Sequence, residues 1–312
     1  MSTETKWPKV AVVGAGAVGG YFGGMLARAR APVVMIGRPS FVEAVKHSGL
    51  RIDSYLFQET VHPQASVSLE AAAGADVVLF CVKTTDTASA SKQLARILPP
   101  DSLVVSLQNG VNNVEEIRAA SGIAALPAVV YVAASVPASG TVKHLGRGDL
   151  VVGPANEKTE KIKRLFESAR VPCRITENIE GELWTKLIWN CALNAVSALG
   201  RVTYGEIIGS TDAKKVIEAA VYETLNVARA KGIHPPGLED PQAALAGSFK
   251  IAEQMSGTRS STAQDLARGK HTEIDSLNGY VARVGAQLGV PTPVNHTLYT
   301  LVKLYESEFN SK

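Results

Sequence analysis

Six residues near the N-terminus have the spacing of a dinucleotide-binding turn. They read Gly14-Ala15-Gly16-Ala17-Val18-Gly19 and follow a short β-branched run, Val10–Val13. In such a G-x-G-x-x-G turn the first glycine allows a tight bend, the second lets backbone approach a pyrophosphate, and the third lets the helix pack on the strand. Glycines also serve merely to bend a chain, but a preceding strand and a following helical pattern favour dinucleotide binding.

Two cations follow strands that should end at the same sheet edge as this turn. After the second expected strand, Val33–Ile36, an acidic residue would hold the ribose 2′-hydroxyl of NAD, but the chain reads Gly37-Arg38. An arginine would instead bind a 2′-phosphate through its planar fork. Lys83, after Val77–Val82, supplies a second cation at that edge. Either residue alone is equally a solvated surface cation; their shared edge favours NADP.

A polar stripe runs along an otherwise apolar helical pattern, Glu182–Leu199. Lys186, Asn190 and Asn194 recur at i, i+4 and i+8, which places them on one helix face. A helix so apolar elsewhere must be largely buried, so its stripe faces either open water or a polar cleft. Amides fix donors and acceptors around a carboxylate or carbonyl, and a desolvated lysine can give up a proton. The periodicity leaves both interpretations open.

A third group of polar residues surrounds Ser261 and Glu273. On one straight helix these two would lie ~18 Å apart, too far to share a small ligand. Gly269 suits a helix end, and Thr272 with Asp275 resembles a capping box, so a new helix is predicted to begin at Thr272. Glu273 would lie in its first turn, where the helix dipole favours a carboxylate; simple helix stabilisation is the alternative.

The elements that position these residues change type midway along the chain. Up to about Thr176, β-branched runs alternate with helical stretches, which predicts parallel strands joined by crossover helices. Strands are expected at Val10–Val13, Val33–Ile36, Val77–Val82, Leu103–Leu107, Ala128–Ala134, Gly140–His144 and Leu150–Val152, the last three forming a partly antiparallel extension. Helices are expected at Val18–Arg28, Asp86–Ile97, Asn113–Ala120 and Asn156–Ser168.

Long helical patterns replace this alternation after residue 177. They run through Glu182–Leu199, Ala213–Lys231, Pro241–Met255 and Thr272–Gln287. The predicted fold class is therefore α/β: a Rossmann-type doubly wound sheet over residues 1–177, binding NADP, and an all-helical domain over 178–312.

The composition is typical of globular domains, and it argues against several classes of function. The 312 residues are 46% hydrophobic and 20% charged, and the net charge of +3 is too small for a broad nucleic-acid or membrane footprint. No spanning segment and no signal peptide are expected, and the six histidines form no ligand-spaced cluster, so no metal is predicted. Three dispersed cysteines fit reduced thiols, which favours a cytoplasmic protein.

With these residues in place, nearly the whole chain resembles the ketopantoate reductases, also called 2-dehydropantoate 2-reductases, which are NADPH-dependent enzymes of pantothenate biosynthesis. The residues on which this resemblance rests are the glycine turn, Lys83, Gln108-Asn109-Gly110, Glu182-Leu183-Trp184-Thr185-Lys186 with Asn190 and Asn194, and Ser261…Gln264-Asp265…Thr272-Glu273-Ile274-Asp275.

The resemblance implies a role for each matching position. Lys186 would be the catalytic lysine, and Asn190, Asn194 and Ser261 would bind the keto acid. Lys83, Asn109 and Glu273 would contact NADP, with Glu273 also close to the reacting centre. Ala133 or Ala134, at the end of the strand Ala128–Ala134, would place a backbone group near the nicotinamide.

One departure bears on the substrate. Family members often carry an asparagine ten residues after the second amide of the stripe, where this chain has Tyr204. The expected reaction is reduction of the C2 ketone of 2-dehydropantoate. The alternatives are another small 2-keto acid, an opine-type or β-hydroxyacid dehydrogenase, and a non-catalytic NADP-binding regulator. A homodimer is compatible with the apolar helices, which could equally form the domain's own core.

Overall fold

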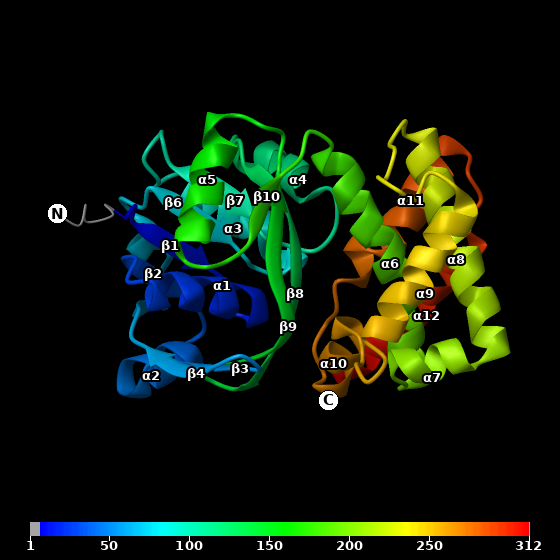
Figure 1. The fold of residues 1–312 in the computed structure, drawn as a ribbon, viewed down its shortest axis with the longest axis horizontal. Helices are drawn as coiled ribbons and strands as arrows, with labels where there is room; N and C mark the ends of the chain where they lie inside the picture. The colour runs from blue at the N-terminus through cyan, green and yellow to red at the C-terminus, as the bar shows by residue number, and fades with distance from the viewer. Residues whose placement is uncertain (1–6, 312) are drawn as a thin grey trace. The chain divides into compact units, whose positions relative to one another are not determined.

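The computed structural model describes residues 7–311 and divides the chain into two compact units. The first is Met1–Ile179 and the second is Glu180–Lys312. The described sheet lies in the first unit, and the regular elements described in the second are all helices (Figure 1). The predicted fold class, a doubly wound α/β unit followed by a helical unit, is confirmed.

Parallel strands form the centre of the first unit. The order along the sheet is β5-β2-β1-β6-β7, and every neighbouring pair is parallel. The bounds are β1 Val10–Val13, β2 Val33–Ile36, β5 Gln64–Ser66, β6 Val77–Phe80 and β7 Leu103–Ser106. Because parallel strands end at one edge, the segments after β1, β2, β6 and β7 meet there. These are the segments that carry the predicted cofactor residues.

Alternate residues of β1 pack in two separate hydrophobic cores, one on each face of the sheet. Val10 and Val12 pack with α1 (Ala17–Arg28), α2 (Pro39–Ser48) and α5 (Glu157–Ser168). Ala11 and Val13 pack with α3 (Thr87–Leu94) and α4 (Asn113–Ser121). This period of two, with both sets apolar, is what a strand buried on both faces requires.

Two long antiparallel strands extend the sheet beyond β7. β8 (Leu126–Ala138) pairs with β9 (Thr141–Val152), and Figure 1 shows them running side by side. Three shorter strands complete this end of the sheet: β3 (Leu50–Ser54), β4 (Gln58–Val61) and β10 (Cys173–Ile175). The antiparallel extension is confirmed, but the prediction of two short strands over 140–152 was wrong. Pairing with β8 and β3 carries β9 through its glycines as one strand.

The helical unit is built around α6 (Ile179–Gly200). Ile188, Ala192 and Leu193 of α6 pack in one apolar core with α7, α8 and α9, and Ala195 and Ala198 pack in another with α10 and α12. The bounds are α7 Tyr204–Gly209, α8 Thr211–Ala230, α9 Pro241–Gln254, α10 Ser261–Ala267, α11 Asn278–Leu288 and α12 Pro293–Ser307. The short helix α7 and the longer α12 were not predicted, and the helix expected from Thr272 begins only at Asn278.

Three further findings concern residues 7–311. None of their helices combines the length and apolarity that a bilayer crossing needs. No group of three or more histidine, cysteine or acidic side chains among them is arranged to hold a metal ion. Cys81, Cys173 and Cys191 are free thiols, as expected from their spacing.

Candidate functional site

The glycine turn bends where only glycine fits. Gly14 has φ +101°, and a Cβ there would lie 2.6 Å from the carbonyl carbon of Cys81. The amides of Gly14 and Ala15 both donate to the carbonyl of Ile36, at 3.0 and 3.1 Å, which ties the turn to the end of β2. The close passage of the turn over β6 and β2 therefore fixes where the following helix begins.

The start of α1 presents backbone rather than side chains. Gly16 caps the helix without a side chain, and a Cβ there would meet no described atom within 4 Å. The first turn, Ala17-Val18-Gly19, contains no acidic residue. First-turn amides lack helical partners, so this end attracts an anion. A glycine with open space in front of it fits a pyrophosphate lying against the backbone, so the residues present fit a dinucleotide.

Arg38 and Lys83 lie in the segments that follow β2 and β6. Arg38 is exposed and caps α2, and its neighbour Gly37 is close to the glycine turn, since a Cβ on Gly37 would lie 3.0 Å from Ala15 Cβ. Lys83 is half-buried at the start of the short 3₁₀ helix η2 (Thr84–Asp86). Both cations therefore lie at the sheet edge that holds the turn.

A buried glutamine links the segments that carry Lys83 and Asn109. Gln108 Nε2 donates to the carbonyl of Val82 at 3.1 Å and to Thr87 Oγ1 at 2.8 Å. Asn109 itself is half-buried, and its carbonyl accepts from Asn113 Nδ2 at 2.8 Å. Gln108 is one of the residues that carry the family resemblance, but no role was predicted for it. Its position directly after a buried strand was the available signal.

Ala133 and Ala134 do not end a strand, which corrects the prediction. β8 continues to Ala138, and its register with β9 shifts between Ala133 and Ala134, so that Ala133 faces Gly146 and Ala134 faces His144. Such an irregularity interrupts the regular ladder of backbone hydrogen bonds. Both residues are half-buried.

The polar stripe of α6 becomes more buried along the helix. Lys186 and Asn190 are half-buried, whereas Asn194 is only 4% exposed. An exposed ribbon on a packed helix is therefore the wrong interpretation for Asn194. The polar groups of a buried residue must be hydrogen-bonded, and the partners of the Asn194 side chain and backbone carbonyl come from two other helices.

Asn194 joins α6 to the starts of α7 and α10. Its side-chain oxygen accepts from the Tyr204 hydroxyl at 2.9 Å, and its carbonyl accepts from Ser260 Oγ at 2.9 Å. The Ser260 hydroxyl also accepts from the amide of Ala263, which caps α10, so the exposed Ser261 is the first residue of that helix. The structure thus brings the segments of Asn194 and Ser261 together.

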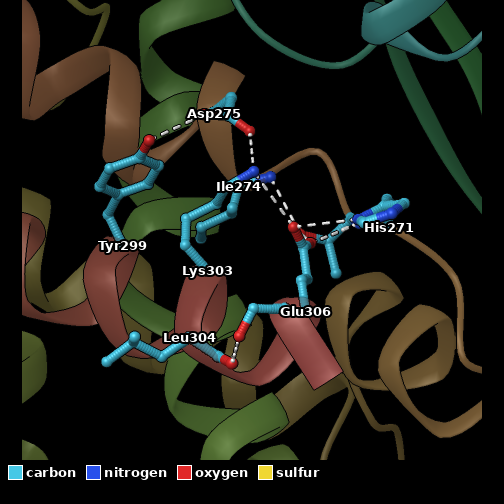
Figure 2. A network of polar contacts seen from close by, with 9 residues as sticks. His271, Ile274, Asp275, Tyr299, Lys303, Leu304 and Glu306 are labelled. Carbon is cyan, nitrogen blue, oxygen red and sulfur yellow. Dashed lines mark hydrogen bonds and ion pairs between the residues drawn. The ribbon is translucent and has the colours of Figure 1, made fainter. Parts of the chain in front are cut away.

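Glu273 lies in a segment that is held to α12. Figure 2 shows Lys303 between two carboxylates, Asp275 at 2.9 Å and Glu306 at 3.2 Å, and Asp275 also accepts from the Tyr299 hydroxyl at 3.0 Å. Glu306 is buried and accepts from both the amide and the hydroxyl of Thr272, at 2.6 Å each. The half-buried Glu273 lies between these anchored residues.

The expected capping box at Thr272 was wrong. Gly269 does end α10 with φ +63°, as predicted, but the next element is a 3₁₀ helix, η3 (Ile274–Ser276), with Glu273 at its cap. The Thr272 hydroxyl donates to the buried carboxylate of Glu306 instead, and Asp275 accepts from Tyr299 and Lys303. Glu306 had no sequence signal, because its partner is 34 residues away.

Burial and hydrogen bonding oppose each other at Glu306. Burial alone would raise the pKa of this carboxyl group, but the Thr272 hydroxyl and amide together with Lys303 outweigh it, so the pKa is held below its usual value. The carboxylate is therefore the stable form, and it stabilises the segment before Glu273.

The fold and the glycine turn define a class of protein, the two-domain nicotinamide-dependent oxidoreductases. The sequence profile of the family described as Ketopantoate reductase PanE/ApbA matches residues 10–157, and that of its C-terminal domain matches residues 178–306. The chain belongs to the ketopantoate reductase family and is an oxidoreductase that uses a nicotinamide dinucleotide and a small-molecule substrate.

Individual relatives agree with this family assignment. The 2-dehydropantoate 2-reductase of Pyrococcus horikoshii is 32% identical and that of Archaeoglobus fulgidus 30%, each alignment covering 96% of this chain and 98% of the relative. A crystal structure of a PanE/ApbA family ketopantoate reductase from Ralstonia eutropha JMP134 is 45% identical, with a TM-score of 0.91 over 97% of this chain and 99% of that one. D-mandelate dehydrogenase in a ternary structure with NADH shares the fold, with a TM-score of 0.89 at 23% identity over 97% of this chain and 99% of that one.

Paired substitutions separate the two roles of the glycine turn, binding the dinucleotide and bending the chain. Gly16→Ala should leave stability unchanged, because its Cβ meets open space, but raise the Kd for the reduced nicotinamide dinucleotide about tenfold or more. Gly14→Ala should lower the free energy of unfolding by about 2 kcal/mol or more, because of its positive φ and the collision with Cys81. Fluorescence titration and urea unfolding measure the two effects. Unchanged affinity in Gly16→Ala would remove the turn from the cofactor site.

The anchor at Glu306 predicts a pH dependence of stability. A carboxyl group whose folded pKa is lowered contributes stability above its unfolded pKa of about 4.3 and loses it as pH falls through the folded pKa. Glu306→Gln should therefore cost about 1–2 kcal/mol at pH 7, and its stability should fall less steeply below about pH 4.5 than that of the parent. Urea unfolding from pH 3 to pH 7 tests this, with the exposed Glu308→Gln as the matched control. Parallel pH profiles in all three proteins would contradict it.

Proposed function

We propose that this chain reduces the C2 ketone of 2-dehydropantoate to pantoate with NADPH, a step of pantothenate biosynthesis. The observation that carries the proposal is the convergence around α6: Lys186, Asn190 and Asn194 share one face, and hydrogen bonds join Asn194 to the segment of Ser261. Membership of the ketopantoate reductase family supports the same reaction class.

The first unit would hold the cofactor. The residues from Gly14 to Gly19 would bind the pyrophosphate through backbone amides, Asn109 would contact the cofactor, and a backbone group of Ala133 or Ala134 would lie near the nicotinamide. Arg38 and Lys83 favour NADPH over NADH, because two cations at one edge would attract a 2′-phosphate and no carboxylate stands in Arg38's place.

The helical unit would carry the acid–base chemistry. Bound NADPH supplies the hydride for the ketone carbon. Lys186 would then stabilise the negative charge that develops on the ketone oxygen and donate the proton that completes the alcohol. Asn190, Asn194 and Ser261 would hold the carboxylate and hydroxyl of the keto acid in place, which adds positioning rather than chemistry. Glu273 would serve both the cofactor and the reacting centre.

Reduction of a different small 2-keto acid is the second candidate, and one residue favours it. Tyr204 replaces the asparagine that many family members carry, and its hydroxyl bonds Asn194, a proposed substrate ligand. A changed neighbour of a substrate ligand is a reason to test substrates other than 2-dehydropantoate.

A substrate and cofactor panel tests the proposal. NADPH oxidation, followed by its absorbance, is expected to be fast with 2-dehydropantoate and slow with pyruvate, 2-oxoisovalerate and oxaloacetate, and NADH should be a poor substitute because the two cations lose their phosphate partner. Turnover of another keto acid alone would select the second candidate. Binding of NADPH without turnover of any acid would indicate a regulator.

Lys186 is the residue whose removal should affect chemistry most. Lys186→Ala is expected to lower kcat about 10²–10⁴-fold, the range typical of a lost general acid, while leaving the Kd for NADPH within about twofold. Steady-state kinetics and cofactor titration measure both quantities. Lys214→Ala, an exposed lysine on α8, is the control and should change neither. A Lys186→Ala enzyme with undiminished kcat would disprove the assignment.

A further inference from the structure

Tyr204 makes a single polar contact through its side chain. Its ring is 6% exposed, and its hydroxyl bonds Asn194 Oδ1 at 2.9 Å and no other residue among 7–311. Burial raises the pKa of this phenol far above its usual value, so the hydroxyl keeps its proton. A protonated hydroxyl beside an amide oxygen is a donor, which fixes the direction of the hydrogen bond.

The backbone around Tyr204 leaves the hydroxyl little freedom. The amide of Tyr204 donates to the carbonyl of Thr258 at 3.0 Å, and the amide of Gly205 donates to that of Ser256 at 2.8 Å. Thr203 caps α7 in a reciprocal pair with Glu206. The first turn of α7 is therefore held from both sides, and the ring packs within the core shared by α6, α7 and α8.

These contacts engage both oxygens of Asn194. Its backbone carbonyl accepts from Ser260 and its side-chain oxygen from Tyr204. An asparagine side chain has one oxygen and one NH₂ group, so the remaining functional group is a donor. Asn194 as a whole is 4% exposed, and the bond from Tyr204 occupies its side-chain oxygen and not its side-chain nitrogen.

We propose that Tyr204 is a positioning residue that turns Asn194 into a donor-only ligand for an acceptor oxygen of the substrate, the carboxylate of the keto acid. This inference rests on the proposed function. An amide held in one orientation binds a carboxylate without first losing the freedom to flip, so the hydroxyl lowers the cost of binding. A neighbour unable to hold the amide oxygen would leave Asn194 able to present either group.

Removing only the hydroxyl tests the inference. Tyr204→Phe keeps the ring, and it should raise KM for the best keto acid of the panel about tenfold, change kcat less than about threefold and leave the Kd for NADPH unchanged. Tyr222→Phe is the matched control, because that tyrosine hydroxyl on α8 also bonds a side-chain amide, accepting from Gln242 Nε2 at 2.9 Å. Tyr222→Phe should leave KM unchanged.

A second variant examines the donor itself. Asn194→Asp keeps the size of the side chain and can still accept from Tyr204, but it presents an oxygen where the substrate requires a donor. KM should rise about a hundredfold or more through repulsion of the keto acid, with NADPH affinity kept. Thermal unfolding of each variant accompanies the kinetics.

The outcomes separate this inference from the proposed function. A parent enzyme that turns over no acid of the panel overturns the proposed function and this inference with it. An active parent whose Tyr204→Phe variant loses thermal stability but keeps its KM overturns this inference alone, because the hydroxyl would then be only structural. An unchanged KM in Asn194→Asp likewise overturns it.

Discussion

A buried polar group must be hydrogen-bonded, and in this protein three such groups hold the functional segments in place. Gln108 joins the segments after β6 and β7, Asn194 joins α6 to the starts of α7 and α10, and Glu306 joins α12 to the segment before Glu273. Each has partners on an element distant in the chain. Leaving any of these groups unpaired costs about 1–3 kcal/mol of folding free energy, so moving the segments that they hold is unfavourable.

The two units solve the problem of positioning in different ways. In the first, the geometry is a property of the parallel sheet: strands that run the same way end at one edge, and Gly14 and Gly16 let the backbone itself face a ligand. In the second, the geometry depends on side chains. The polar residues of α6 are placed by which faces of that helix the apolar cores occupy, and by the few polar partners that those cores enclose.

Tyr204 shows how a residue next to a proposed substrate ligand can differ while that ligand stays the same. The four proposed substrate-site residues are among those on which the sequence resemblance rests, whereas Tyr204 departs from it; the four are Lys186, Asn190, Asn194 and Ser261. The tyrosine lies within the core and reaches the site only through its hydroxyl. A substitution one layer behind a ligand changes which atoms that ligand can offer, whereas a substitution of the ligand itself would remove it.

Features that depend on local patterns could be predicted from the sequence. The glycine turn, the parallel strands around it, the fold class and the single polar face of α6 follow from turn chemistry and from periods of 2 and 3.6 residues, which neighbouring residues set. The end of α10 at Gly269 was predictable for the same reason, because a residue just past a helix end favours glycine.

Features that depend on distant partners could not be predicted, because they are set by which elements pack together in the folded chain. Thr272 and Asp275 could cap a helix locally, yet Glu306, Tyr299 and Lys303 bind them instead, so the following helix begins at Asn278. β9 is one strand because β8 and β3 pair with it along its length. The burial of Asn194 and its bond to Tyr204 likewise need three helices to meet. The physical reason is that a polar side chain has several acceptable partners, and which one it binds depends on which elements pack beside it.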